Sequence, residues 1–290
     1  MLWFLLALAS TVLYSVVNIS DKALVNRYLK NPLLGTIVCN ITMIPVIAIA
    51  FLVSPPEILK IDEFLMLLTA TLFGIAGVLL YFKAMQKAEP SRLVVALQSL
   101  PLFVLVLAVI FLGEALSYAQ IFGIISIVVA SILVSDGKLG KNKWALTAFL
   151  CSLLWAMEAI ITKYLLGSID YWSLFLWSSF ITLSVYAIAL PLYFKELRGA
   201  IVAKPKLLAF GFLSAGSYFV AYILELMALS IRYVSLVSAI GALQPFIVLV
   251  LAFMVSKFAP SLFREAIDRK SITIKVVGAL LASFGVMLLL

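Results

Sequence analysis

The chain has 290 residues, of which 65% are hydrophobic and only 12% are charged. Soluble domains are about half apolar and about a quarter charged, so this composition indicates a polytopic membrane protein. The sequence has no histidine, and its two cysteines, Cys39 and Cys151, lie in separate apolar runs. We therefore expect no metal site, no cofactor and no catalytic triad. The net charge is +8, but the basic residues lie in short connections between apolar runs, which indicates membrane topology rather than nucleic-acid binding.

Apolar runs of about 20 residues, separated by charged or Pro/Gly-containing breaks, predict ten transmembrane helices. In chain order they cover residues 2–22, 33–53, 63–85, 91–112, 117–135, 144–166, 171–194, 206–229, 233–257 and 272–290. The first run lacks the basic segment of a signal peptide, so we interpret it as the first membrane helix. The connection "SDGKLGKNK" at 135–143 has the character of a soluble linker and leaves five helices on each side.

The two halves of the sequence repeat each other. At an offset of 141 residues, Trp3, Tyr14 and Lys22 align with Trp144, Trp155 and Lys163. At an offset of 144 residues, "SLPLFVLVLA" at 99–108 aligns with "LQPFIVLVLA" at 243–252. Because each unit has an odd number of helices, the second copy is inverted in the membrane. We therefore predict an all-α membrane protein of ten transmembrane helices in two inverted five-helix repeats, at 1–135 and 144–290, joined by a linker at 136–143. Such repeats are typical of alternating-access transporters, whose site lies between them.

The distribution of basic residues predicts the orientation. The connections after the odd-numbered helices, with the helix ends that flank them, contain 18 of the 21 lysines and arginines. Basic residues are retained on the cytoplasmic side of a membrane. We therefore expect a multi-pass protein of the cell membrane with both termini outside.

Two carboxylates, Glu158 and Glu225, lie inside apolar helices. An intramembrane charge without a partner, a proton or water is costly, so each needs one of these. The two helices run in the same direction and place both acids at similar depth. Two carboxylates in one cavity repel each other, which favours a bound proton on one of them. We predict that this pair exchanges a proton for a cationic or zwitterionic solute. The alternative is that Glu158 pairs with Lys163 and Glu225 with Arg232, and that both only fix helix packing.

Aromatic and amide side chains are predicted to bind the solute. Some share a helix face with an acid, and two glutamines stand near Pro101 and Pro245, where a kink frees a backbone carbonyl. Packing and interfacial anchoring are the alternatives for these residues. The predicted contacts are Tyr14, Asn18, Tyr81, Gln98, Trp155, Tyr218, Tyr222 and Gln244.

Three lysines, Lys22, Lys83 and Lys163, stand at or near the ends of predicted helices. They support a second interpretation, in which they bind a phosphorylated or carboxylated solute. The alternative for each is that its long side chain reaches the membrane surface.

The segment "FLGEALSYAQIFGIISIVVASILVS" at 111–135 resembles the end of helix 4, the Gly-Glu turn and helix 5 of the ten-helix EamA-type transporters of the drug/metabolite transporter superfamily. Gly113 and Glu114 form the turn. The second half departs from this pattern, because Lys257 and Phe258 stand at the corresponding position and an eleven-residue charged insertion follows.

Two aromatic-small pairs, Tyr14-Ser15 and Trp155-Ala156, are each followed by a lysine eight residues after the aromatic residue. This is similar to the pattern of the same family in helices 1 and 6, and the resemblance covers essentially the whole chain. It implies a secondary transporter with a central cavity, usually an exporter of small organic metabolites. Family members usually keep their termini inside, whereas the charge distribution of this chain places them outside.

We therefore predict a secondary active transporter that moves a small amphipathic solute, such as an amino acid or amine, by proton-coupled export. The alternatives are an exchanger of anionic metabolites that uses the membrane lysines, and a non-transporting scaffold or accessory subunit. An enzyme is not expected, because no nucleophile-base pair is visible. The predicted partners are the solute and the lipid bilayer, with the chain as a monomer or a homodimer.

Overall fold

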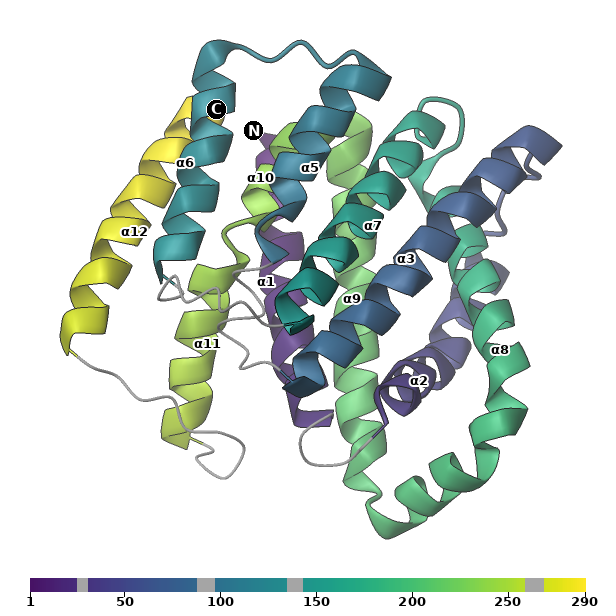
Figure 1. Cartoon of the computed structure of the whole chain (residues 1–290). Coiled ribbons are helices and arrows are strands. Elements are labelled where there is room, and N and C mark those ends of the chain that lie inside the picture. The colour runs from purple at the N-terminus through teal and green to yellow at the C-terminus, as the bar shows by residue number, and fades with distance from the viewer. Residues whose placement is uncertain (25–30, 88–96, 135–142, 259–268) are drawn as a thin grey trace.

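The computed structural model describes residues 1–24, 31–87, 97–134, 143–258 and 269–290. In these ranges every regular element is a helix, and no strand occurs (Figure 1). The helices are α1 (Leu2–Ala23), α2 (Pro32–Val53), α3 (Ile61–Lys87), α5 (Leu100–Leu107), the π-helical turn η2 (Ala108–Leu112), α6 (Tyr118–Val134), α7 (Lys143–Leu165), α8 (Tyr171–Ala203), α9 (Lys206–Ile231), α10 (Val234–Gly241), α11 (Gln244–Phe258) and α12 (Arg269–Leu289).

The length and composition of these helices define a multi-pass membrane protein. Among the described residues, 7 helices are long and apolar enough to cross a membrane. Three shorter apolar helices cover Leu100–Leu112, Tyr118–Ala130 and Val277–Leu289. The predicted all-α membrane class is therefore confirmed. The predicted linker at 136–143 lies almost entirely outside the described residues.

One predicted helix is interrupted and another is longer than expected. The run at 233–257 forms two helices, because α10 ends at Gly241 and α11 begins at Gln244. Pro245 explains the interruption, since it lacks a backbone donor and its ring would clash with the carbonyl group four residues earlier, at Gly241. Helix α8 continues to Ala203, beyond the predicted end at 194.

The same kind of interruption occurs in the first half. Gln98 and Ser99 form a turn before α5, and Pro101 is its second residue. At the offset of 144 residues, this turn corresponds to the turn between α10 and α11. Broken helices at corresponding positions are the feature that marks the binding site in many transporters built from repeats.

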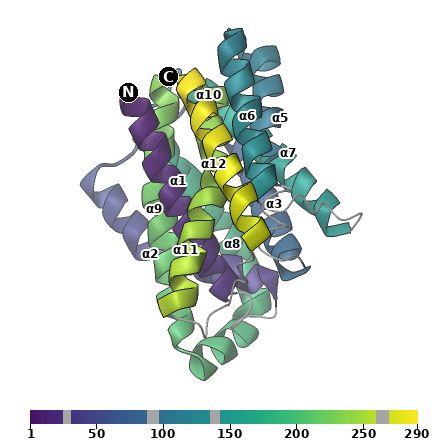
Figure 2. The same ribbon diagram turned by 90° about the vertical axis from the view of Figure 1, so that its left-hand side faces the viewer.

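The long helices pair across the middle of the sequence. Helix α1 packs along α9, α3 packs along α7, and α6 packs along α12 (Figures 1 and 2). The first helix of each predicted five-helix unit thus contacts the third helix of the other unit. Both termini, the connection from η2 to α6 and the connection from α7 to α8 lie at one end of the bundle (Figure 1), which we call the termini side.

Helices α6 and α12 approach each other through glycines. A Cβ atom built on Gly285 would lie 2.8 Å from the carbonyl oxygen of Gly123 and 2.7 Å from a side-chain carbon of Ile127. Both distances are too short for a real contact, so the two backbones are close enough that only glycine fits.

We expect Gly285→Ala to lower the thermal stability of the purified protein, by about 1–3 kcal/mol, because the added methyl group overpacks the contact between α6 and α12. The matched control is Gly216→Ala in α9, where an added Cβ has nothing within 4 Å. The control should be neutral or slightly stabilising, because alanine favours a helix over glycine. Equal destabilisation of the two variants in thermal unfolding would contradict the close packing.

Candidate functional site

The two membrane glutamates stand on α7 and α9. Glu158 and Glu225 are both partly buried, and they are close enough for their charges to interact. The hydroxyl of Tyr14, on α1, donates a hydrogen bond of 2.6 Å to Oε2 of Glu225. Because α1 packs along α9, this contact joins the first and second halves of the chain. We call Glu158 and Glu225 the acid pair.

The acid pair has no basic partner within ion-pair distance in the described part of the chain. The ion pair found there is Lys60–Glu63, at the start of α3. Lys163 donates instead to the backbone oxygens of Leu229 and Arg232, at 2.5 Å and 2.9 Å. It therefore satisfies carbonyl groups at the end of α9, as basic side chains commonly do at helix C-termini. The ion pairs of the alternative interpretation, Glu158 with Lys163 and Glu225 with Arg232, are absent from the described residues.

Arg232 and Lys83 also form no ion pair with the acids in the described part of the chain. The guanidinium of Arg232 lies 5.9 Å from the ring centres of both Trp3 and Tyr233. Lys83 is exposed on α3, and the side chain of Lys22 lies outside the described residues. The lysines as anion contacts stay a prediction.

Three tyrosines form a wall beside Glu225. The ring of Tyr218 meets Tyr14 edge-on at 5.8 Å and stacks on Tyr222 at 5.7 Å between centroids. Tyr222 also lies close to Thr162 on α7. Tyr218 keeps 41% of its surface accessible. The spacing of four and three residues along α9 puts this wall on the face that carries Glu225.

Glycines on α3 make the space for Glu158 and its neighbour Trp155. A Cβ atom on Gly74 would lie 2.5 Å from Oε1 of Glu158, and one on Gly77 would lie 2.5 Å from the indole nitrogen of Trp155. The two side chains of α7 therefore lie directly against the α3 backbone. These glycines were not predicted as part of the site, although small residues one turn apart are a known signal of close helix packing in membranes.

A further carboxylate, Asp21, was also missed. Its side chain is 4% exposed, and it accepts a hydrogen bond of 2.6 Å from the hydroxyl of Ser214. The polar stripe predicted on α1 was Tyr14, Asn18 and Lys22, whereas the buried stripe ends at Asp21. The spacing of four and then three residues follows one face of a helix better than two steps of four, and this signal was available in the sequence.

Asn18 and Tyr81 meet within the same region. The hydroxyl of Tyr81 donates a hydrogen bond to Oδ1 of Asn18, and its ring lies 5.7 Å from that of Trp155. The two glutamines lie at the helix breaks. Gln98 is 4% exposed, and its Oε1 has no hydrogen-bond partner among the described residues. Gln244 is partly buried at the start of α11. Solute contact by these residues stays a prediction.

Glu114 joins the two halves at the termini side. Gly113 adopts a φ of 63°, a left-handed conformation that ends η2 and that glycine tolerates best. The next residue, Glu114, is buried and accepts the backbone N–H groups of Val234 and Ser235 at 2.7 Å and 3.3 Å, together with the Ser235 hydroxyl. A carboxylate at this position satisfies free donors and the positive end of α10. The Gly-Glu turn therefore has a structural use in this chain.

We expect Glu114→Ala to destabilise the protein by about 1–3 kcal/mol, because it leaves buried N–H groups at the start of α10 unpaired. The control is Glu196→Ala, which removes an exposed carboxylate from α8. Thermal unfolding of the purified variants measures the difference. A loss no larger than that of the control would show that the start of α10 does not depend on Glu114.

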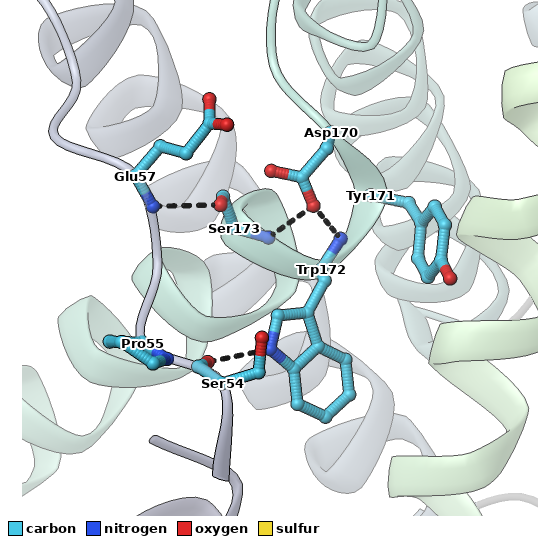
Figure 3. A pocket seen from close by; sticks show the side chains of 7 residues that line it. All are labelled: Ser54, Pro55, Glu57, Asp170, Tyr171, Trp172 and Ser173. Atoms are coloured by element: carbon cyan, nitrogen blue, oxygen red, sulfur yellow. Dashed lines mark hydrogen bonds between the residues drawn. The ribbon is translucent and has the colours of Figure 1, made fainter. Parts of the chain in front are cut away.

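Two hollows are found elsewhere on the molecule. One of about 420 Å³ lies at the termini side, between the end of α2 and the start of α8 (Figure 3). Trp172 donates from its indole to the carbonyl of Ser54 at 2.8 Å, and the backbone N–H of Glu57 donates to Ser173 at 2.9 Å. The other, of about 300 Å³, lies between α2 and α8 beside Tyr186. Neither is lined by the acid pair, so the central chamber stays a prediction.

Asp170 begins α8 beside the first hollow. Its Oδ1 accepts the backbone N–H groups of Trp172 and Ser173 at 2.9 Å and 3.0 Å (Figure 3). Partial burial acts to raise the pKa of this carboxyl, but the hydrogen bonds from Ser173 and Trp172 outweigh it and hold the pKa below its usual value. Asp170 is therefore an N-cap that favours its charged form.

We expect Asp170→Ala to lower stability by about 1 kcal/mol near neutral pH, as for other N-caps. Because the pKa is lower in the folded than in the unfolded protein, the charge-dependent part is present above the unfolded pKa of about 3.9. It is lost as the pH falls through the folded pKa. The gap between wild type and variant in thermal unfolding should therefore narrow in acid. Asp170→Asn keeps an acceptor and isolates the effect of charge. If the stability difference between the wild type and Asp170→Asn did not change with pH, it would contradict a charged N-cap at Asp170.

Comparisons with known proteins agree with this architecture. The model of the EamA-like transporter family matches residues 1–136. A solved structure titled "Crystal structure of protein" covers 99% of this chain and 94% of its own, with a TM-score of 0.71 and 15% identity, and 29 solved chains match in all. The curated proteins give no match.

The match of the first half to the EamA-like transporter family indicates a membrane transporter of the drug/metabolite transporter superfamily, and the helices define a multi-pass membrane protein. Residues 1–136 match the EamA-like transporter family, and 99% of the chain shares its fold with the solved structure. The resemblance seen in the sequence is therefore confirmed.

Proposed function

We propose that the protein is a secondary active transporter that exchanges protons for a small cationic or zwitterionic organic solute, such as an amine or amino acid, and so exports it. The observation that carries the proposal is the acid pair, which lies inside the helix bundle without a basic partner in the described residues. Two adjacent carboxylates in a membrane are balanced by a proton or by a cationic solute, and either can replace the other.

The aromatic wall supports an organic solute rather than a bare ion. The hydroxyl of Tyr14 binds Glu225, and the ring of Tyr218 contacts the rings of Tyr14 and Tyr222. Aromatic rings attract ammonium groups and stack against flat or apolar parts of a solute. Acid and aromatic groups therefore favour one amphipathic molecule with a positive charge.

The arrangement of the lysines gives less support to an anion exchanger. The ammonium group of Lys163 already binds two carbonyl oxygens, and Lys83 is exposed. A negatively charged solute next to the acid pair would also meet repulsion. We therefore prefer the cationic class of solute.

The test begins with purified protein and a panel of amines, amino acids and sugar phosphates, scored by thermal stabilisation at two pH values. For each compound that stabilises the protein, uptake is then measured in liposomes that contain the protein and carry a pH gradient. We expect Glu158→Gln and Glu225→Gln each to lower gradient-driven flux about tenfold or more, because each removes a proton-binding carboxylate. Glu196→Gln, on the exposed surface of α8, should keep the wild-type rate.

Three outcomes would contradict the proposal. Stabilisation by sugar phosphates alone would favour the anion exchanger. Full gradient-driven flux in Glu158→Gln would remove the acid pair from proton coupling. A wild-type protein that folds and moves no member of the panel would favour a scaffold.

A further inference from the structure

Asp21 is a buried carboxylate that the proposed exchange does not use. It lies two residues before the end of α1, and its side chain is 4% exposed. Burial of an ionised carboxylate inside a membrane protein is costly, so such a group is retained where a proton, a cation or several donors balance it.

Among the described residues, the surroundings of Asp21 provide one hydroxyl donor and no positive charge. Ser214 on α9 donates the hydrogen bond of 2.6 Å. The titratable groups that interact with Asp21 are Cys39 of α2 and Tyr81 of α3, and both are neutral in their usual protonation state. Among the described residues no basic nitrogen lies within 4.0 Å of Asp21. The side chain of Lys22 lies outside the described residues.

A row of polar side chains, Tyr14, Asn18 and Asp21, extends along α1 from Asp21 toward the acid pair. Tyr14, Asn18 and Asp21 share one face of α1 and span about 10 Å at about 1.5 Å per residue. At one end of this row Tyr14 donates a hydrogen bond to Glu225, and in the middle Asn18 accepts a hydrogen bond from Tyr81. Tyrosine hydroxyls both accept and donate a proton, so they are suited to a relay.

The direction of α1 places Asp21 on the side of the acid pair away from the termini. Helix α1 begins at the termini side and ends after Asp21, and α9 packs along it in the opposite direction (Figure 1). Asp21 is therefore nearer to the face that the basic residues mark as cytoplasmic.

We propose that Asp21 is a second proton-binding site, linked to the acid pair through Tyr14, Asn18 and Tyr81. The proposal rests on the proposed function in that the proton comes from the acid pair. The proton leaves the carboxyl group of Glu225 and binds the carboxylate of Asp21. Asp21 becomes neutral, and Glu225 regains the negative charge that attracts a cationic solute.

The test is an infrared titration of the full-length protein in lipid, followed through the band of protonated carboxyl groups while the pH is changed. We expect Asp21→Asn to remove one titrating carboxyl, whereas Asp62→Asn, an exposed control at the start of α3, should leave the buried carboxyl bands unchanged. In Glu158→Gln/Glu225→Gln the Asp21 band should remain and its midpoint should move, because the charges of the acid pair no longer act on it.

Asp21→Glu serves as a second variant, because it keeps a titrating carboxyl group and should therefore keep the band. The titration uses no solute, so it stays valid if the proposed transport activity is not found. Identical bands in the wild type and Asp21→Asn would overturn the proposal. A band that follows sodium concentration at constant pH would also overturn it, since Asp21 would then bind a metal cation.

Discussion

A carboxylate inside a membrane has to be balanced, and this constraint organises the interior of the bundle. Asp21 and Glu225 each accept a hydrogen bond from one hydroxyl group, and Glu158 lies against the bare backbone of Gly74. The nearby positive charge of Lys163 is held by backbone carbonyls instead. The described interior therefore keeps an excess of acidic groups, and that excess supports the proposed site for protons and cationic solutes.

The site depends on contacts between the two halves of the chain. Glu225 from the second half binds Tyr14 from the first, and Glu158 from the second half fills the space over Gly74 of the first. Glu114 adds a third connection at the termini side, where it binds the start of α10. Neither half alone would place an acid beside its donor, so the pairing of α1 with α9 and of α3 with α7 is what assembles the site.

The apolar runs predicted most helix positions, because a bilayer demands about 20 apolar residues for each crossing. Helices α1 and α9 begin where predicted and end within two residues of the predicted positions. The predicted end of α8 at 194 was wrong. Charged residues end the apolar run there, but a helix can continue beyond the hydrocarbon region of the bilayer. Asp21 was missed because it stands beside Lys22 at the predicted end of the first helix, where charged side chains commonly reach the membrane surface. Contacts between distant residues, such as that of Glu114 with Val234, leave no periodic signal within either segment.

The glycines of α3 also limit how the bundle is able to change shape. Glu158 and Trp155 of α7 occupy the gaps that Gly74 and Gly77 leave in the surface of α3. If α7 slid along α3, these side chains would clash with the bulkier residues on either side of the glycines. The two helices are therefore constrained to move as one rigid body. A boundary between rigid parts would therefore separate α3 with α7 from their neighbours, and it would not coincide with the midpoint of the polypeptide.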